Sequence, residues 1–227
     1  MSGFWRTTWL LARKDLLLEA RSRELTLAMG LFALVSLVLA EYATGAAAEA
    51  DRALLASGLV WLVVLFTAML GLQRSFAAER DEGLFDALLL APLDRAAIWA
   101  GKVVALTALL LLVEVVLVPL TWLFFFEGVT TQSPSLLTLC AALAVANLGI
   151  AGAGAFVASL ASAARQREVL LPVLFLPAVT PLLIAGVTAT VSSSEGDAVA
   201  QPLLLLLVYD AVVGVLAWGA FDHVITE

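Results

Sequence analysis

The chain consists mainly of long apolar stretches separated by short polar connections. A helix that crosses the hydrocarbon core of a bilayer needs roughly 20 mostly apolar residues, and each stretch is close to that length. A membrane-spanning strand would instead alternate strictly between apolar and polar residues over about ten positions, and none of the stretches does so. The pattern predicts an all-α polytopic membrane protein with six transmembrane helices at 25–44, 53–72, 103–126, 136–161, 169–191 and 202–221.

The residues before the first apolar stretch, 1–24, have a different pattern. Apolar side chains recur there at helical spacing and form one stripe, while the basic side chains lie elsewhere around the helix. We therefore predict an N-terminal amphipathic helix at the membrane surface, where tryptophan prefers the level of the lipid headgroups. Anchoring alone accounts for such a helix, and the alternative is that it also touches a cytoplasmic subunit. The stripe contains Trp5, Trp9, Ala12 and Leu16, and the basic residues are Arg6, Arg13, Lys14 and Arg21.

Composition supports the membrane assignment and limits the functions that the chain can have. Hydrophobic residues make up 63% of the chain and charged residues 14%, and the mean hydropathy is +1.05. A water-soluble domain of 227 residues would need far more polar surface. We therefore expect residues 1–227 to form a single transmembrane domain surrounded by the lipid bilayer. The net charge of -7 argues against nucleic acid as a partner.

The basic residues are distributed unevenly along the chain. Eleven of the 12 Lys and Arg residues lie in three segments, namely residues 1–24, the connection 73–102 and the connection 162–168. The remaining one, Arg52, lies between the first two apolar stretches. Because cytoplasmic connections retain an excess of Lys and Arg during insertion, we predict that both termini and the connection 73–102 lie in the cytoplasm.

The connection 73–102 carries the densest group of charges. Leu84 and Leu88 recur in it at four-residue spacing, which gives a short helix an apolar face. Gly83 allows a bend before this helix, and Pro92 ends it. A short helix of mixed apolar and acidic character under the bilayer suits docking into a groove on another protein, and a solvated run of charges is the alternative. The charges are Glu79, Arg80, Asp81, Glu82 and Asp86.

Several blocks of the chain resemble a known family of membrane proteins. The order ERDEG at 79–83, LLL at 88–90, PL at 92–93 and GK at 101–102 is similar to the cytoplasmic segment of the ABC-2 type permeases. A narrower resemblance covers nearly the whole chain and is to the haem exporter B family, CcmB, of cytochrome c maturation. The blocks that carry it are FWRTTWLLARKDLLLEARSRE at 4–24, the stretch from GLVWLVV to WAGKV at 58–103, and LPAVTPLLI at 176–184.

This resemblance implies the permease subunit of an ABC transporter in a bacterial inner membrane, with a role in haem transport and cytochrome c biogenesis. The implied partners are an ATPase subunit, CcmA, the membrane subunits CcmC and CcmD, and the haem chaperone CcmE. A generic ABC-2 exporter of lipid, polysaccharide or drugs is the alternative. The resemblance places the coupling to the ATPase at Glu79, Arg80, Asp81, Glu82, Gly83, Leu84 and Leu88.

Other classes of function fit the sequence less well. The chain contains no G-x-x-x-x-G-K-[ST] phosphate-binding loop, so we expect a partner subunit to hydrolyse ATP and this chain to be non-catalytic. A membrane enzyme would need a converging nucleophile, base or set of metal ligands, and one histidine with scattered acids does not form a recognised set. A purely structural assembly subunit would leave the docking helix without an energetic purpose.

Two acidic residues, Glu114 and Asp210, lie near the middle of predicted spans. Glu114 follows Lys102 by twelve residues, which is roughly 18 Å along a helix and places it near the bilayer centre. Acids at this depth are costly, and they usually face a bundle interior or a cavity and serve a function. The alternative is a structural role in which protonated acids bond to neighbouring hydroxyl or carbonyl groups. If the two acids are adjacent, we expect them to share a proton.

The sequence offers few side chains that could ligate haem iron, which needs a His, Met, Cys or Tyr donor. The single histidine, His223, falls at the end of the last span, and Cys140 is the only cysteine. We interpret Met29, Met69 and Tyr42 as packing or lipid-facing residues. We therefore expect the chain to bind no cofactor or metal itself, with haem as a substrate that partner subunits ligate.

Two spans have compositions that predict their packing. The span 136–161 carries small residues at close spacing, including Gly149, Gly152 and Gly154, and should pack closely against neighbouring helices. The span 169–191 contains three prolines and should be kinked or broken, because each proline removes a backbone donor. These prolines are Pro172, Pro177 and Pro181.

Overall fold

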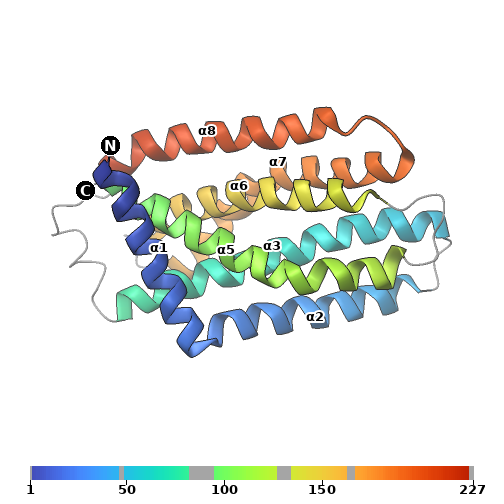
Figure 1. Ribbon diagram of the computed structural model, residues 1–227, viewed down its shortest axis with the longest axis horizontal. Helices are drawn as coiled ribbons and strands as arrows, with labels where there is room; N and C mark the ends of the chain where they lie inside the picture. Colours follow the sequence, from blue (N-terminus) through green and yellow to red (C-terminus); the bar gives the residue numbers. More distant parts are fainter. Residues whose placement is uncertain (1, 46–48, 82–94, 127–133, 163–166, 225–227) are drawn as a thin grey trace.

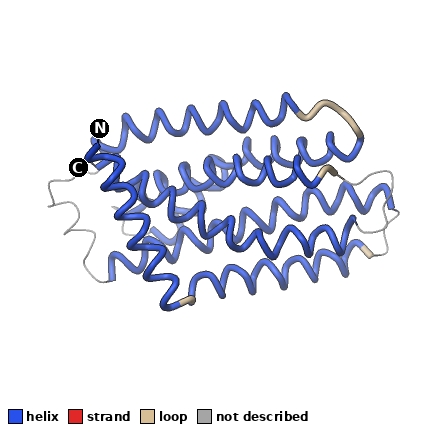
Figure 2. The backbone as a smooth tube through the Cα atoms, in the orientation of Figure 1, coloured by secondary structure: helices blue, strands red, loops and turns tan. Residues whose placement is uncertain are grey.

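The computed structural model describes residues 2–45, 49–81, 95–126, 134–162 and 167–224. Within these ranges the chain consists of helices joined by short loops and contains no strand, which confirms the all-α prediction (Figure 2). In chain order the helices are α1 (Ser2–Ser22), α2 (Glu24–Thr44), α3 (Glu49–Asp81), α5 (Arg95–Thr121), the π-helix η1 (Trp122–Phe126), α6 (Leu136–Ser162), α7 (Arg167–Glu195) and α8 (Ala200–Val224).

Six of these helices are long and apolar enough to cross a membrane, as the sequence predicted. They comprise α2, α3, α5 together with η1, α6, α7 and α8. The apolar parts agree with the predicted spans to within a few residues at most ends. The clearest difference lies in the connection 73–102, because α3 continues helically to Asp81 and α5 already begins at Arg95.

The six long helices run side by side along the long axis of the molecule, and α1 lies across one end of them (Figure 1). The two chain termini lie at this same end, which agrees with an even number of spans. α6 lies at the centre and contacts α3, α5, α7 and α8. The side of the membrane on which the termini lie stays a prediction.

The small residues of α6 explain its central place. Ala146 and Ala151 are fully buried, and a Cβ added at Gly154 would overlap the side chain of Leu72 from α3. At Gly152 the backbone carbonyl accepts a hydrogen bond of 3.1 Å from the indole nitrogen of Trp99 in α5. Short side chains let the helix axes approach closely, and close packing drives helix association in lipid. The prediction that this span is a packing helix is confirmed.

α7 continues as one helix through Pro172, Pro177 and Pro181, so a break in the fifth span is excluded, while a kink at the prolines stays a prediction. Helices in membranes tolerate proline where neighbouring helices and hydroxyl side chains support the interrupted turns. α7 packs against α3, α6 and α8, and Thr180 Oγ1 donates a 2.7 Å hydrogen bond to the carbonyl of Leu176 between two of the prolines.

A helix irregularity that the sequence did not predict lies at the end of α5. Pro119 lies inside α5 and cannot donate to the carbonyl of Val115 four residues earlier. Three residues later the helix widens into the π-helical turn η1. π-Helical turns of this kind are frequent at functional sites.

Candidate functional site

The residues predicted to couple to an ATPase lie only partly within the described chain. Glu79, Arg80 and Asp81 form the last turn of α3, while Glu82, Gly83, Leu84 and Leu88 lie outside the described residues. The docking helix therefore stays a prediction. The structure shows that the helices on either side of this segment, α3 and α5, meet it at the end of the bundle that α1 crosses (Figure 1).

α1 is attached to the start of α5 by an ion pair. Asp15 lies 2.9 Å from Nζ of Lys102, and the side chain of Lys102 is only 7% exposed. Lys14 lies 3.2 Å from the other oxygen of the same carboxylate. Removal of one partner from a charge pair that is shielded from water is costly, because it leaves a poorly solvated charge. Lys102 closes the connection 73–102, so this pair links α1 to the end of the predicted coupling segment.

Backbone packing strengthens the same contact. A Cβ added at Gly101 would lie 2.9 Å from Leu11 Cβ and 3.2 Å from the carbonyl oxygen of Thr8. Thr8 and Ala12, on the side of α1 that faces α5, are buried. Glycine at position 101 therefore lets the backbone of α1 lie directly on α5.

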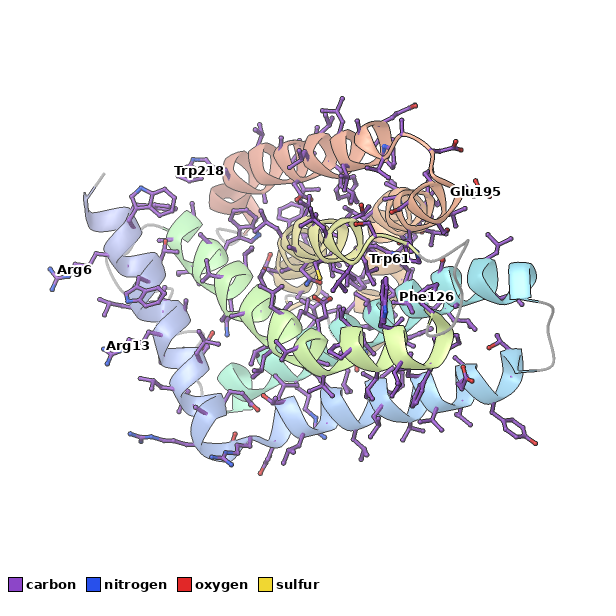
Figure 3. All side chains as sticks on the ribbon, turned by 45° about the vertical axis from the view of Figure 1, so that its right-hand side comes forward. Arg6, Arg13, Trp61, Phe126, Glu195 and Trp218 are labelled. Carbon is purple, nitrogen blue, oxygen red and sulfur yellow. The ribbon has the colours of Figure 1, made fainter. Side chains whose placement is uncertain are left out.

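The face of α1 that packs on the protein differs from the predicted stripe. Ala12 is buried, but Trp5 and Trp9 are 67% and 59% exposed. The helix thus has a protein-facing side around Thr8 and Ala12, and the tryptophans beside it are free to meet lipid headgroups. Arg6 and Arg13 point away from the bundle (Figure 3).

Both ends of α1 are joined to the transmembrane helices. At its start the ring of Phe4 lies 4.8 Å from that of Trp218 in α8. At its end Arg23 adopts the left-handed conformation with φ of 57°, which makes a sharp joint to α2. Across this joint the carboxylate of Glu19 accepts a 2.7 Å hydrogen bond from the backbone N–H of Thr26, satisfying a donor that the start of α2 leaves open. α1 therefore bridges α2, α5 and α8.

Glu114 of α5 has a hydrogen-bond partner on α6 that the sequence did not predict. Asn147 of α6 donates a 2.8 Å hydrogen bond from its side-chain amide to Glu114 Oε2. Glu114 is 6% exposed and Asn147 is fully buried. Glu114 Oε1 and Asn147 Oδ1 have no hydrogen-bond partner within the described chain. A lone asparagine in an apolar span was the signal that could have indicated this pair.

Asp210 of α8 occupies a different site. It lies against Gly149 of α6, where an added Cβ would overlap Oδ1 of the carboxylate. Both carboxylate oxygens are buried, and neither has a hydrogen-bond partner among the residues described. The neighbouring Tyr209 donates its hydroxyl to the carbonyl of Ala178 in α7. The glycine therefore provides the space that the acid fills.

The two intramembrane acids are not brought together. Glu114 meets α6 at Asn147 and Asp210 meets it at Gly149, and residues two positions apart point about 200° apart on a helix. The body of α6 thus lies between the carboxyl groups, and no hydrogen bond within the described chain joins them. A shared proton was expected only if the two acids were adjacent, and this condition is not met.

The candidate haem and metal donors are scattered. Within the described residues no group of three His, Cys, Asp or Glu side chains is placed to hold a metal ion. Met29 is buried against Gly71, Met69 packs on the core and Tyr42 is 88% exposed, which agrees with packing and lipid-facing roles. Cys140 is exposed on α6, and the side chain of His223 is not described.

Comparison with known proteins connects this architecture to one family. The model of the family described as CcmB protein matches residues 6–226. The chain is 31% identical over 175 residues to heme exporter protein B of Rhodobacter capsulatus, covering 77% of this chain and 78% of the relative. It is 30% identical over 187 residues to heme exporter protein B of Pseudomonas aeruginosa, covering 82% and 81%. The protein of the same description from Paracoccus denitrificans is 29% identical over 158 residues, covering 70% and 69%.

Proposed function

The chain belongs to the CcmB family, and from this membership we propose that it is the membrane permease subunit of a haem exporter of cytochrome c maturation. The match over residues 6–226 is the observation that carries the proposal. The six membrane-spanning helices supply the architecture that a permease needs. The alternative of a generic exporter of lipid, polysaccharide or drugs is not favoured, since the three relatives share the description heme exporter protein B.

The energy for transport comes, in this proposal, from a separate CcmA-like ATPase on the cytoplasmic side. The chain contains no phosphate-binding loop of its own. The ATPase docks on residues 79–90 and, on closing around ATP, pushes this segment and the two helices that flank it. α3 and α5 are those helices, and each is continuous from the bundle into the connection.

The contact between α1 and α5 supports a mechanical role for the N-terminal helix in this coupling. When the start of α5 is displaced, the Asp15–Lys102 ion pair and the close contact at Gly101 transmit the displacement to α1. From there α1 leads to α2 through the joint at Arg23 and to α8 through Phe4. The amphipathic helix then moves with the transmembrane helices. In addition to anchoring the chain, it transmits the displacement of α5 to α2 and α8.

The proposal places the chain in a bacterial inner membrane with both termini in the cytoplasm. The basic residues concentrated in residues 1–24 and in the connections 73–102 and 162–168 support this orientation. The membrane partners are a CcmC-like and a CcmD-like subunit, and a CcmE-like chaperone receives the haem outside. These partners ligate the haem, because this chain offers few donors and the described ones are scattered.

Copurification from membranes tests the proposal. The tagged chain should retain the ATPase and the CcmC-like subunit, and cells that carry it should load haem on the chaperone. Charge reversal at Asp81 and Glu82, or Leu84→Ala with Leu88→Ala, should lower both ATPase retention and chaperone loading. Reversal at Asp94, in the same connection but outside the docking segment, is the matched control and should change neither. Unaltered retention and loading in the first two variants would contradict the coupling role of this segment.

A further inference from the structure

A groove with a volume of about 720 Å³ opens on the surface of the bundle between α5, η1 and α6. On α5 and η1 it extends from Leu111 to Leu123, which is roughly 18 Å or about three helical turns. Its rim is apolar, and Val115 on that rim is 69% exposed to the region that lipid occupies. A groove of this length and direction fits a segment of helix that lies along the bundle.

The groove has a polar point among these apolar walls. Glu114 lines it, and the Oε1 atom of this nine-tenths-buried acid has no partner within the described chain. Oδ1 of Asn147, the residue that donates to Glu114, also has no hydrogen-bond partner within the described chain. Pro119, also in the groove wall, leaves the carbonyl of Val115 without its usual helical donor. The missing complement is therefore a hydrogen-bond donor, and beside a carboxylate a cationic donor complements best.

The chain cannot supply such a cation from its own spans. The six apolar stretches 25–44, 53–72, 103–126, 136–161, 169–191 and 202–221 contain no Lys, Arg or His. A second copy of the chain likewise has no Lys, Arg or His in these stretches. An acyl chain of a lipid carries no donor, and lipid headgroups lie far from the middle of the bilayer, where Glu114 lies.

We propose that the groove seats a transmembrane helix of another subunit of the same complex, and that this helix presents a Lys, Arg or His side chain to Glu114. The inference rests on the proposed function only for the existence of membrane partners. Ionisable residues inside membranes commonly pair with one another. A basic residue on the partner helix that pairs with Glu114 therefore offsets the free-energy cost of placing both groups inside the membrane. The apolar rim then packs against the remainder of that helix.

Cys140 provides a direct test, because it is the only cysteine of the chain, is exposed and lines the groove. A maleimide that carries a photoreactive benzophenone, attached to Cys140 in native membranes, should crosslink to a different membrane subunit. Peptide mapping of the adduct should identify a transmembrane segment with a basic residue. In the matched control, Cys140→Ser with Leu204→Cys, the label sits on the exposed face of α8 and should not give this adduct.

Variants at Glu114 test the ionic contact. Glu114→Leu should lower the crosslinked fraction about three- to tenfold, the range expected from the loss of one polar contact between membrane helices. Asp210→Asn, at a buried acid outside the groove wall, should leave the fraction unchanged. Retention of the ATPase by the Glu114 variant shows that it is folded and assembled. If the unaltered chain itself fails to retain the ATPase, that result would count against the proposed function.

The proposal has clear contrary outcomes. An adduct of the labelled chain with a second copy of itself, with lipid alone or with a small molecule would overturn it. So would a partner segment without a basic residue, or an unchanged crosslinked fraction in Glu114→Leu.

Discussion

Asp210 of α8 lies directly against Gly149 of α6, and the absence of a side chain at position 149 creates the space that the carboxylate occupies. α8 exposes many of its apolar residues on one side, and on the other it packs against α6 and α7, where Tyr209 donates a hydrogen bond to the carbonyl of Ala178. The contact between Asp210 and Gly149 therefore lies within the packing of α8 on α6.

Gly149→Ala should displace α8, because the added methyl group would overlap Asp210 Oδ1. Overpacking of this kind costs about 1–3 kcal/mol, so we expect a lower thermal unfolding temperature for the purified complex. The double variant Gly149→Ala with Asp210→Ala should recover most of the loss. Gly214→Ala is the control, since a Cβ there meets nothing within 4 Å. Equal effects of both glycine variants would contradict the local clash.

Breaking the Asp15–Lys102 pair should loosen α1. Lys102→Met removes the partner at 2.9 Å and leaves Lys14 beside the carboxylate, so we expect a loss of about 1.5–3 kcal/mol in the stability of the α1 contact. Limited proteolysis within residues 1–24 should become faster. Arg13→Ala, at an exposed position of the same helix, should leave the proteolysis rate unchanged. Protection of α1 in Lys102→Met equal to that in the unaltered chain would show that the ion pair contributes little.

Trp61 and Thr190 should be energetically coupled. The indole nitrogen of Trp61 in α3 donates a 3.0 Å hydrogen bond to Thr190 Oγ1 in α7, and both residues are buried. A double-mutant cycle of Trp61→Phe and Thr190→Val should give a coupling free energy of about 0.6–1.7 kcal/mol, as for other polar pairs between membrane helices. Thr190→Ser keeps the hydroxyl and should lose less stability than Thr190→Val. A coupling energy near zero would mean that packing alone holds this contact.

Opposite ends of the bundle should be labelled from opposite sides of the membrane. In a Cys140→Ser background, Gly3→Cys marks the end with the termini and Ala198→Cys marks the loop between α7 and α8 at the other end (Figure 2). An impermeant thiol reagent added to spheroplasts should label Ala198→Cys alone, because the basic connections hold the other end in the cytoplasm. Labelling of Gly3→Cys in intact spheroplasts would reverse the predicted orientation.

The sequence by itself determined the helical class and the number of spans. In lipid the backbone must satisfy its own hydrogen bonds, so an apolar stretch of about 20 residues has essentially one solution, a transmembrane helix. This constraint holds whatever the neighbours are, and most ends of the predicted spans therefore agree with the structure to within a few residues. The sequence did not show that α7 continues unbroken through its three prolines, because the cost of a proline depends on neighbouring helices.

The tertiary structure decided which faces of the helices meet. A helix in lipid is apolar on its buried side and on its lipid side, so its hydrophobic pattern does not distinguish the two, whereas in water the polar face would mark the outside. For this reason the sequence located Glu114 and Asp210 in depth but could not show that Asn147 meets the first and Gly149 the second. The same holds for α1, where only packing on α5 selected Thr8 and Ala12, and not Trp5 and Trp9, as the residues that face the protein.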